Sequence, residues 1–188
     1  MSLATMLVPT YLNMLGALSA WLEKGKQQGF DMDALMAERL ADDMFPLATQ
    51  VRFSCVQALE GVHRLGGKDF PPLVSELLAE GREAENAAGS LEAAQSRIAQ
   101  TIEMVREVAV DIGEGDPERA LEHAIPTGLV FDFTAEQYAR DWALGQFYFH
   151  VMIAYAILRS RGADLGKADY VVHLFPFIRP GTMPEVAG

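Results

Sequence analysis

The segment Thr134–Arg161, TAEQYARDWALGQFYFHVMIAYAILRSR, decides the fold. Thr134 is followed three residues later by Gln137, a capping-box pattern that predicts the N-terminus of a helix. Gly162 comes directly after Arg161 and predicts that the helix stops there. No charged side chain occurs over residues 142–158. Because this run is shorter than the roughly 20 residues of a membrane span, it indicates a helix buried inside a soluble bundle.

Three further long helices are expected, because apolar residues recur at spacings of three and four. They cover Leu3–Gln27, about Asp42 to Leu65, and Leu91 to about Ile112. Either Asp42 or Asp43 is predicted to cap the second of them, with Pro46 in its first turn. Ser90 is predicted to cap the third.

The links between these helices carry weaker signals. Residues 31–41 predict a short helix or turn, and residues 73–88 predict a weak short helix or a mobile link. Thr127–Gly128 separates two short extended runs over residues 123–133, which predicts a small β-hairpin. The expected fold is therefore all-α, a four-helix bundle over residues 1–165 with this hairpin before its last helix. Residues 166–188, rich in proline and phenylalanine, are expected to form an irregular tail that packs on the bundle or on a partner subunit.

Composition restricts the classes of function. The chain has 188 residues and a formal net charge of −11, which disfavours binding to nucleic acid and to anionic membranes. A single cysteine, Cys55, permits no internal disulfide and no cysteine-rich zinc site. The N-terminus lacks the basic start of a signal peptide, so we expect a cytoplasmic protein.

The last helix is apolar on both faces, so each face needs a cover. A regular helix of 100° per residue predicts an inward face of Ala139, Trp142, Gln146, Phe149, His150, Ile153 and Ile157. The predicted outward face consists of Leu144, Tyr148, Val151, Tyr155 and Leu158. Either the tail or a second subunit could cover it, and the length of the helix favours a homodimer through Tyr148, Val151 and Tyr155.

Two polar residues on the inward face are the leading candidates for a functional site. Gln146 and His150 stand four residues apart, so their side chains project one above the other. They predict either a ligand or metal site inside the bundle or a hydrogen-bonded structural pair. Four other residues are weaker candidates, because none has an evident catalytic or metal-binding partner in the sequence: Cys55, His63, His123 and His173.

Four stretches resemble an uncharacterised branch of bacterial proteins within the DinB-like (YfiT-like) clan of proposed metalloenzymes. They are PTYLNML at 9–15, LADDMFPLATQV at 40–51, QFYFHVMIAYAILR at 146–159 and LGKADY at 165–170. They occur in the same order and span most of the chain. The resemblance implies a four-helix bundle, often dimeric, with no established reaction.

The resemblance also implies where a site would lie. The wider clan carries three metal-binding histidines, one on its second helix and two on its last, and here these positions correspond to Gln50, Gln146 and His150. Only one of the three is a histidine, and a glutamine amide is a poor substitute for imidazole on zinc or nickel. We therefore expect no cofactor at this site, and a divalent metal bound by His150 is the alternative. Three functions stay open: a small-molecule pocket between the second and last helices, a non-enzymatic dimeric protein, and a metal-dependent enzyme.

Overall fold

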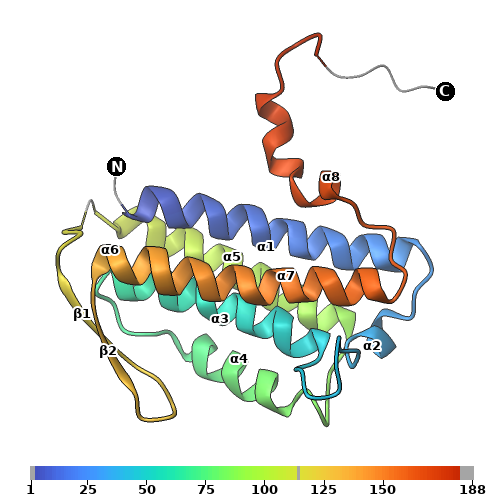
Figure 1. Ribbon diagram of the computed structural model, residues 1–188, viewed down its shortest axis with the longest axis horizontal. Coiled ribbons are helices and arrows are strands. Elements are labelled where there is room, and N and C mark those ends of the chain that lie inside the picture. Colours follow the sequence, from blue (N-terminus) through green and yellow to red (C-terminus); the bar gives the residue numbers. More distant parts are fainter. Residues whose placement is uncertain (1–2, 114, 183–188) are drawn as a thin grey trace.

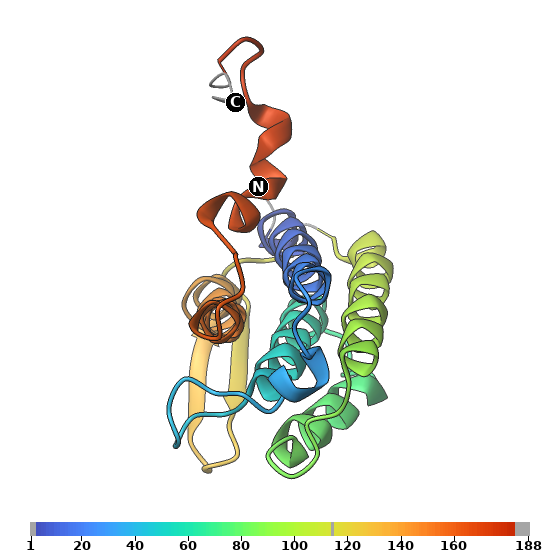
Figure 2. The ribbon, with the colours of Figure 1, turned by 90° about the vertical axis from the view of Figure 1, so that its right-hand side faces the viewer.

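Four long helices run side by side in the computed structural model, which describes residues 3–113 and 115–182 (Figure 1). Their bounds are α1 (Leu3–Gln27), α3 (Leu47–Leu65), α5 (Leu91–Asp111) and α7 (Leu144–Ser160). The end view in Figure 2 shows α3 between the other three helices. Within this bundle α3 packs against α1, α5 and α7, so nearly every α3 side chain that points inward is fully buried.

The core consists of large apolar side chains from all four helices. Tyr11 of α1 meets Phe147 of α7 edge to face, with ring centroids 4.7 Å apart. Both side chains are completely buried, and each such burial stabilises the fold by about 2–3 kcal/mol. By length and composition alone α1 could cross a membrane, a test that the core helix of a bundle also passes. Its apolar stripe is part of this core.

Most predicted helix ends are confirmed. The Ser90 hydroxyl accepts a hydrogen bond from the Ala93 amide at the start of α5. Thr134 and Gln137 form the expected reciprocal capping box. The start of α3 was predicted wrongly: neither Asp42 nor Asp43 caps it, and Pro46 occupies the N-cap position instead. Residues 40–46 form a bend that precedes the helix, since proline disfavours helical geometry in the residue before it.

Two short helices complete this part of the fold. Residues 31–41 contain α2 (Met32–Leu35), capped by the Asp31 carboxylate. The expected weak helix after residue 72 is a well-formed helix, α4 (Pro72–Glu83), which packs on α3. An ion-pair network holds α4 in place, because Glu80 bonds both the buried Arg52 of α3 and Arg97 of α5.

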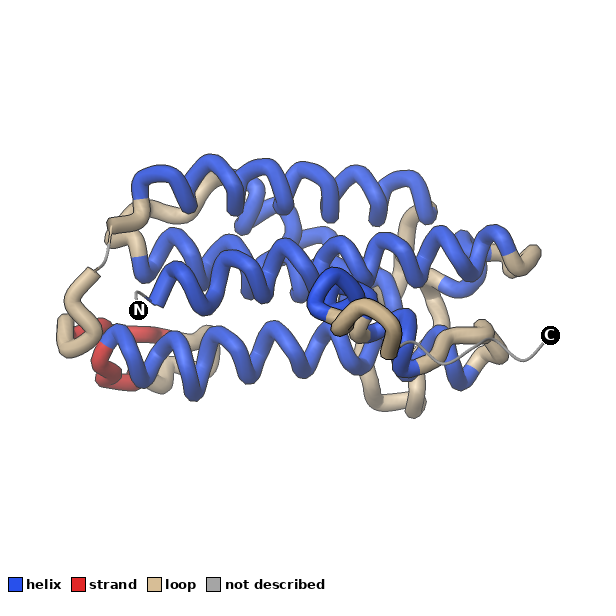
Figure 3. The backbone as a smooth tube through the Cα atoms, turned by 90° about the horizontal axis from the view of Figure 1, so that it is seen from above, coloured by secondary structure: helices blue, strands red, loops and turns tan. Residues whose placement is uncertain are grey.

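A two-stranded antiparallel sheet covers one end of the bundle beside the start of the last helix (Figure 3). Strand β1 (Ala120–Ala124) pairs with β2 (Val130–Thr134) in a register that sets His123 opposite Phe131. The predicted hairpin is therefore confirmed, with β1 beginning three residues earlier than expected. Alternate residues of β1 are buried, so Leu121 and His123 face the bundle.

The last helix contains a π-helical turn that the sequence did not reveal. It begins with α6 (Ala135–Gln137), continues through η1 (Tyr138–Ala143) as a π-helix, and becomes regular α-helix in α7. A π turn holds about one extra residue, which rotates all following side chains by about 100°. The predicted faces of α7 were consequently wrong by one residue.

The residues that are buried along α7 differ from those predicted for its inward face. The buried residues are Phe147, His150, Val151, Ala154, Ile157 and Leu158. Val151 and Leu158 were assigned to the outward face and are completely buried. Phe149 was assigned to the inward face and is 56% exposed.

Beyond Gly162 the chain crosses over α1 and then leaves the bundle (Figure 1). Helix α8 (Lys167–Tyr170) lies on α1, where Lys24 pairs with Asp169 at 2.8 Å. The Trp21 indole donates to the Asp169 carbonyl oxygen at 3.1 Å. The following 3-10 helix η2 (Val172–Phe177) projects away from the bundle, and together with Ile178 it exposes apolar side chains: Val172, Leu174, Phe175, Phe177 and Ile178.

Candidate functional site between α3 and α7

Two of the three predicted site residues meet across the α3–α7 contact. The Gln50 side chain from the first turn of α3 lies 2.9 Å from His150 of α7, measured from Oε1 to Nδ1. Gln50 is 2% exposed and His150 is 9% exposed, so this hydrogen bond lies inside the bundle. A hydrogen bond between residues 100 positions apart fixes the relative position of the two helices at this point.

A second hydrogen bond sets the direction of the first. The Gln50 amide nitrogen donates to the Phe45 carbonyl oxygen at 3.2 Å. Because a carbonyl oxygen can only accept, the amide group of Gln50 must turn its own oxygen toward His150. The Nδ1 atom of His150 therefore carries the hydrogen, and the lone pair of the neutral ring lies on Nε2.

Burial keeps His150 uncharged. Desolvation lowers the pKa of His150 to about 4, so the ring is neutral at pH 7. Aromatic rings surround it: the centroid of Phe53 is 5.4 Å away and that of Phe149 is 5.3 Å away, both edge to face. Phe45 packs on Phe53, and both Phe45 and Phe149 are about half exposed. The site thus combines one oriented hydrogen-bond acceptor with an aromatic rim that reaches solvent.

Gln146, the third predicted residue, is less closely engaged. It stands one helical turn before His150 and is partly buried. Within residues 3–113 and 115–182 its side chain forms no hydrogen bond with another residue, unlike that of Gln50. Its amide remains available to a ligand that reaches His150.

The donor atoms at this site do not fit a divalent metal. Both ends of the Gln50 amide are engaged, by His150 and by Phe45. The Nε2 atom of His150 and the Gln146 amide are the remaining donors, fewer than the three protein ligands of a typical catalytic zinc site. In the described part of the chain no three side chains of His, Cys, Asp or Glu come close enough to hold a metal ion.

The weaker sequence candidates separate into three kinds. Cys55 is completely buried, and desolvation raises the pKa of its thiol to about 12, which makes it a poor nucleophile. His63 bonds the Leu59 carbonyl oxygen of its own helix at 2.8 Å, a structural role. His173 lies in η2. His123 is different, because it is buried beside Tyr138 and Trp142, residues that no sequence pattern links to it.

The three residues predicted to form a dimer interface, Tyr148, Val151 and Tyr155, are at least partly buried within the chain. Val151 is completely buried within the chain and presents no surface to a partner. Tyr148 and Tyr155 are partly buried. The Tyr155 ring packs edge to face on Trp21 at 5.1 Å, and its hydroxyl donates to the Leu165 carbonyl oxygen at 3.4 Å. The segment after α7 therefore covers part of the face that was assigned to a partner.

Comparison with known proteins agrees with this architecture. A search of curated proteins finds no match. Among solved structures, the chain is similar to a DinB family member protein from Shewanella denitrificans, with 27% sequence identity and a TM-score of 0.70. The match covers 99% of this chain and 96% of that one. The profile of a domain of unknown function, DUF1993, matches residues 3–171. The resemblance seen in the sequence is thereby confirmed, and the chain belongs to the DUF1993 family and has a DinB-like fold.

Proposed function

We propose that the chain is a small-molecule binding protein whose ligand lies against His150, between α3 and α7. The observation that carries this proposal is the state of the His150 ring, which is neutral and has Gln50 on Nδ1. In the described part of the chain no residue bonds its Nε2 atom. This lone pair is not among the fully buried atoms that lack a partner, so it stays within reach of solvent and can accept a hydrogen bond from a ligand that donates one there.

The surroundings favour a ligand with an aromatic or apolar body. Phe53 and Phe149 flank the imidazole, and Phe45 packs on Phe53. Phe45 and Phe149 are about half exposed. Apolar walls with a few placed polar groups are the usual composition of small-molecule sites. Gln146 is close enough along the helix to add a second polar contact.

Binding is favoured over proton abstraction at this site. A general base works best when its pKa is near the working pH. The pKa of His150 is held near 4 by burial, about three units below neutral pH. The ring is therefore a better hydrogen-bond acceptor than a proton acceptor, and the proposal is a binding function.

Phenol and anisole form a matched pair of probes for this proposal. They share an aromatic body, but only phenol has a hydroxyl that can donate to Nε2. We expect phenol to shift the His150 ring nitrogen resonances in a saturable way and anisole to bind at least several-fold more weakly. His150→Phe, which keeps an aromatic ring and removes the lone pair, should abolish the preference for phenol.

Two outcomes of this titration would overturn the proposal. One is equal binding of phenol and anisole to the parent chain, and the other is an unchanged preference in the His150→Phe variant. His173→Phe serves as the control substitution, because His173 lies in η2 away from the bundle. Thermal melts of both variants establish that each is folded.

We also propose that the chain forms a homodimer through the projecting segment at Val172–Ile178. Five exposed apolar residues lie close together in sequence on an arm that leaves the bundle, and exposed apolar groups of this kind often mark association sites. Light scattering on the full chain over a range of concentrations tests this, with Phe177→Ser expected to shift the population toward monomer. Val110→Ser, at an equally exposed position on α5, is the matched control. A monomer at every concentration would contradict the proposal.

A further inference from the structure

Buried polar atoms without hydrogen-bond partners gather where the hairpin closes over the end of the bundle. They are Tyr11 Oη of α1, Arg64 Nε of α3, His123 Nδ1 and Nε2 of β1, and Tyr138 Oη and Trp142 Nε1 of η1. In the described part of the chain none of these six atoms forms a hydrogen bond of normal geometry, although the Arg64 guanidinium is close enough to the Tyr138 hydroxyl to lower its pKa against the larger effect of burial. Tyr11 and Tyr138 are completely buried, and His123 is 4% exposed.

These side chains form one cluster. The His123 ring lies 4.4 Å from the Trp142 ring and 5.5 Å from the Tyr138 ring. The Arg64 guanidinium carbon lies 5.6 Å from the centroid of the Tyr138 ring. Tyr11 lies near enough for the charges of Tyr138 and Glu60 to add to the effect of burial in raising its pKa, and Glu60 adds to burial in the same way in raising the pKa of Tyr138.

Such a concentration of unpaired groups needs an explanation. More than nine-tenths of buried polar groups in folded proteins have a partner, and each one left without a partner costs about 1–3 kcal/mol. Two of the side chains, Tyr138 and Trp142, stand on the π-helical turn, a distortion that is frequent at functional sites. The helix is therefore distorted at the point where unsatisfied groups collect.

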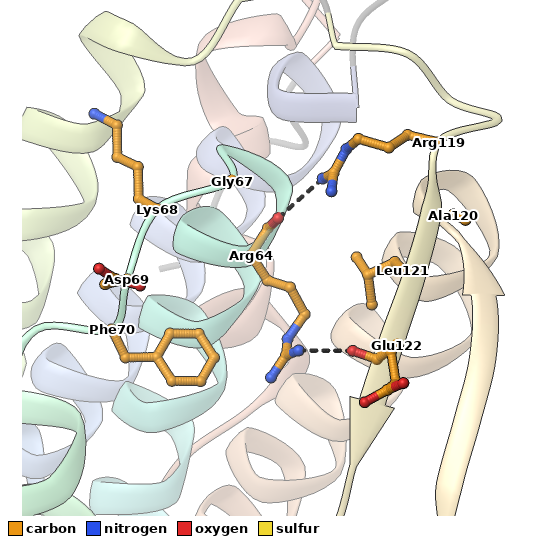
Figure 4. A pocket seen from close by; sticks show the side chains of 9 residues that line it. All are labelled: Arg64, Gly67, Lys68, Asp69, Phe70, Arg119, Ala120, Leu121 and Glu122. Carbon is orange, nitrogen blue, oxygen red and sulfur yellow. Dashed lines mark hydrogen bonds between the residues drawn. The ribbon is translucent and has the colours of Figure 1, made fainter.

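A cavity of about 340 Å³, whose lining residues are drawn in Figure 4, shares Arg64 with the cluster. This volume is at the lower end of the range for ligand pockets, which suits a small molecule. Its walls come from the end of α3, the following loop and β1, and the residues that line it include Arg64, Lys68, Phe70, Arg119, Leu121 and Glu122. Arg64 belongs to both features, because it lines the cavity and also lies against Tyr138.

The guanidinium of Arg64 is oriented but not neutralised. It donates to the Glu122 carbonyl oxygen at 3.0 Å and lies over the Phe70 ring at 4.9 Å. Within the described residues it forms no ion pair, and the nearby Glu60 carboxyl reaches it only through a longer-range attraction. Arg119 is already engaged, because it donates to the carbonyl oxygens of Arg64 and Leu65 at the end of α3.

The unpaired groups select the charge of a ligand. Four of the six atoms are donors: the two phenol hydroxyls, the Trp142 indole N–H and Arg64 Nε–H. His123 is neutral at pH 7, because burial and then the positive charge of Arg64 lower its pKa to about 4. Donors in excess around one unpaired guanidinium favour an anion, and a carboxylate matches the planar fork of arginine.

We propose that this end of the bundle is a second binding site, which takes a small organic carboxylate. In this proposal the carboxylate pairs with Arg64 on the cavity wall and also accepts a hydrogen bond from the Tyr138 hydroxyl, since the Tyr138 ring centroid lies 5.6 Å from the guanidinium carbon. Trp142 does not line the cavity and belongs to the buried cluster through its contact with His123. The negative end of the α3 dipole lies at the same place and opposes any anion, so a dianion such as phosphate is disfavoured more strongly than a singly charged carboxylate. Positions 50 and 64 of α3 are about 21 Å apart along the helix, so this site is separate from the one at His150.

Titration of the full chain with benzoate at constant ionic strength tests the proposal. Benzamide serves as the uncharged analogue and inorganic phosphate as the competing anion. The indole N–H resonance of Trp142 reports on the site. The indole of Trp21 already donates to Asp169, so its resonance is an internal reference. We expect a saturable shift of the Trp142 resonance with benzoate, a much weaker effect of benzamide and phosphate, and no change at Trp21.

Variants separate a specific site from general attraction. Arg64→Gln removes the charge, and Tyr138→Phe removes only the hydroxyl. Each should weaken benzoate binding at least about tenfold, because a hydrogen bond to a charged group is lost. Arg106→Gln, a change at an exposed arginine of α5, should leave binding unchanged.

Three results would overturn the proposal. They are the absence of a saturable benzoate response, equal responses to benzoate and benzamide, and tighter binding of phosphate than of benzoate. The first result would mean that ordered water alone satisfies the buried groups. None of the three bears on His150, so the two sites can fail independently.

Discussion

Two buried histidines, His150 and His123, lie in similar surroundings but differ in whether their ring nitrogens have a hydrogen-bond partner. His150 and His123 are both in contact with aromatic rings, and desolvation lowers the pKa of each to about 4. His150 has a partner in Gln50, whose own amide is held by Phe45. His123 has no hydrogen-bond partner on either ring nitrogen in the described part of the chain. Both rings are therefore buried, and they differ in that only His150 has a hydrogen-bond partner.

The difference separates two uses of a buried ring. A partner on one nitrogen fixes the tautomer and contributes to stability, so His150 serves the fold while it presents its second nitrogen to a ligand. A ring without any partner costs stability, and such a cost is maintained where a ligand or water completes the site.

The pH dependence of stability should show the cost of burying both neutral rings. Each folded-state pKa, about 4, lies below the ordinary value of about 6.5, so the unfolded chain binds more protons between these values. Stability should therefore be complete above about pH 6.5 and fall as the pH drops toward 4, by up to roughly 3 kcal/mol for His150. Urea unfolding at several pH values measures this.

Between pH 6.5 and 5 the carboxylates with lowered pKa values, such as Glu80, stay ionised. Burial raises the pKa of Glu60, which adds an opposing slope that the parent chain and the two leucine variants share. His150→Leu and His123→Leu should each flatten the slope of stability against pH in this window. An unchanged slope in both variants would show that the rings are protonated in the folded chain.

Removal of the imidazole should affect the two sites unequally. His150→Leu leaves the Gln50 amide oxygen buried without a donor, which should cost about 1–3 kcal/mol of unfolding free energy at pH 7. His123→Leu leaves no new unpaired group, so it should stay within about 1 kcal/mol of the parent chain. Chemical unfolding of the two variants gives the difference, and equal losses would remove the contrast.

The smallest effect is expected at Tyr138. Its hydroxyl is completely buried and, in the described chain, forms no hydrogen bond of normal geometry, although the Arg64 guanidinium lies close enough to interact with it. Tyr138→Phe should therefore leave the ligand-free protein as stable as the parent or stabilise it by up to about 1 kcal/mol. A loss above about 1 kcal/mol in thermal or chemical unfolding would mean that water or another residue already satisfies the hydroxyl.

Sequence patterns located most of the fold and part of the site. Helical periodicity and caps were sufficient for α1 and α5, because their apolar stripes are one-sided and Ser90 marks a start. The resemblance assigned Gln50 and His150 to one site, and their side chains do form a hydrogen bond with each other. These features depend on local signals or on helix pairing, which a sequence carries directly.

The remaining features depend on geometry that the sequence does not encode locally. A helix apolar all round has no preferred direction, so a single π turn in η1 moved Val151 inward and Phe149 outward without any visible signal. His123 could have been placed facing the bundle from strand alternation with Leu121. Its neighbours Arg64 and Tyr138 come from distant segments, and only tertiary packing brings them together.

The most direct test of this account is the state of the two imidazole rings, measured by long-range proton–nitrogen correlation from pH 7 to pH 4. We expect both rings to be neutral at pH 7 and to titrate near pH 4. His150 should be a single tautomer with its hydrogen on Nδ1, whereas the ligand-free His123 should show no such fixed preference. A charged His150 near pH 6, or a hydrogen on its Nε2 atom, would contradict the account.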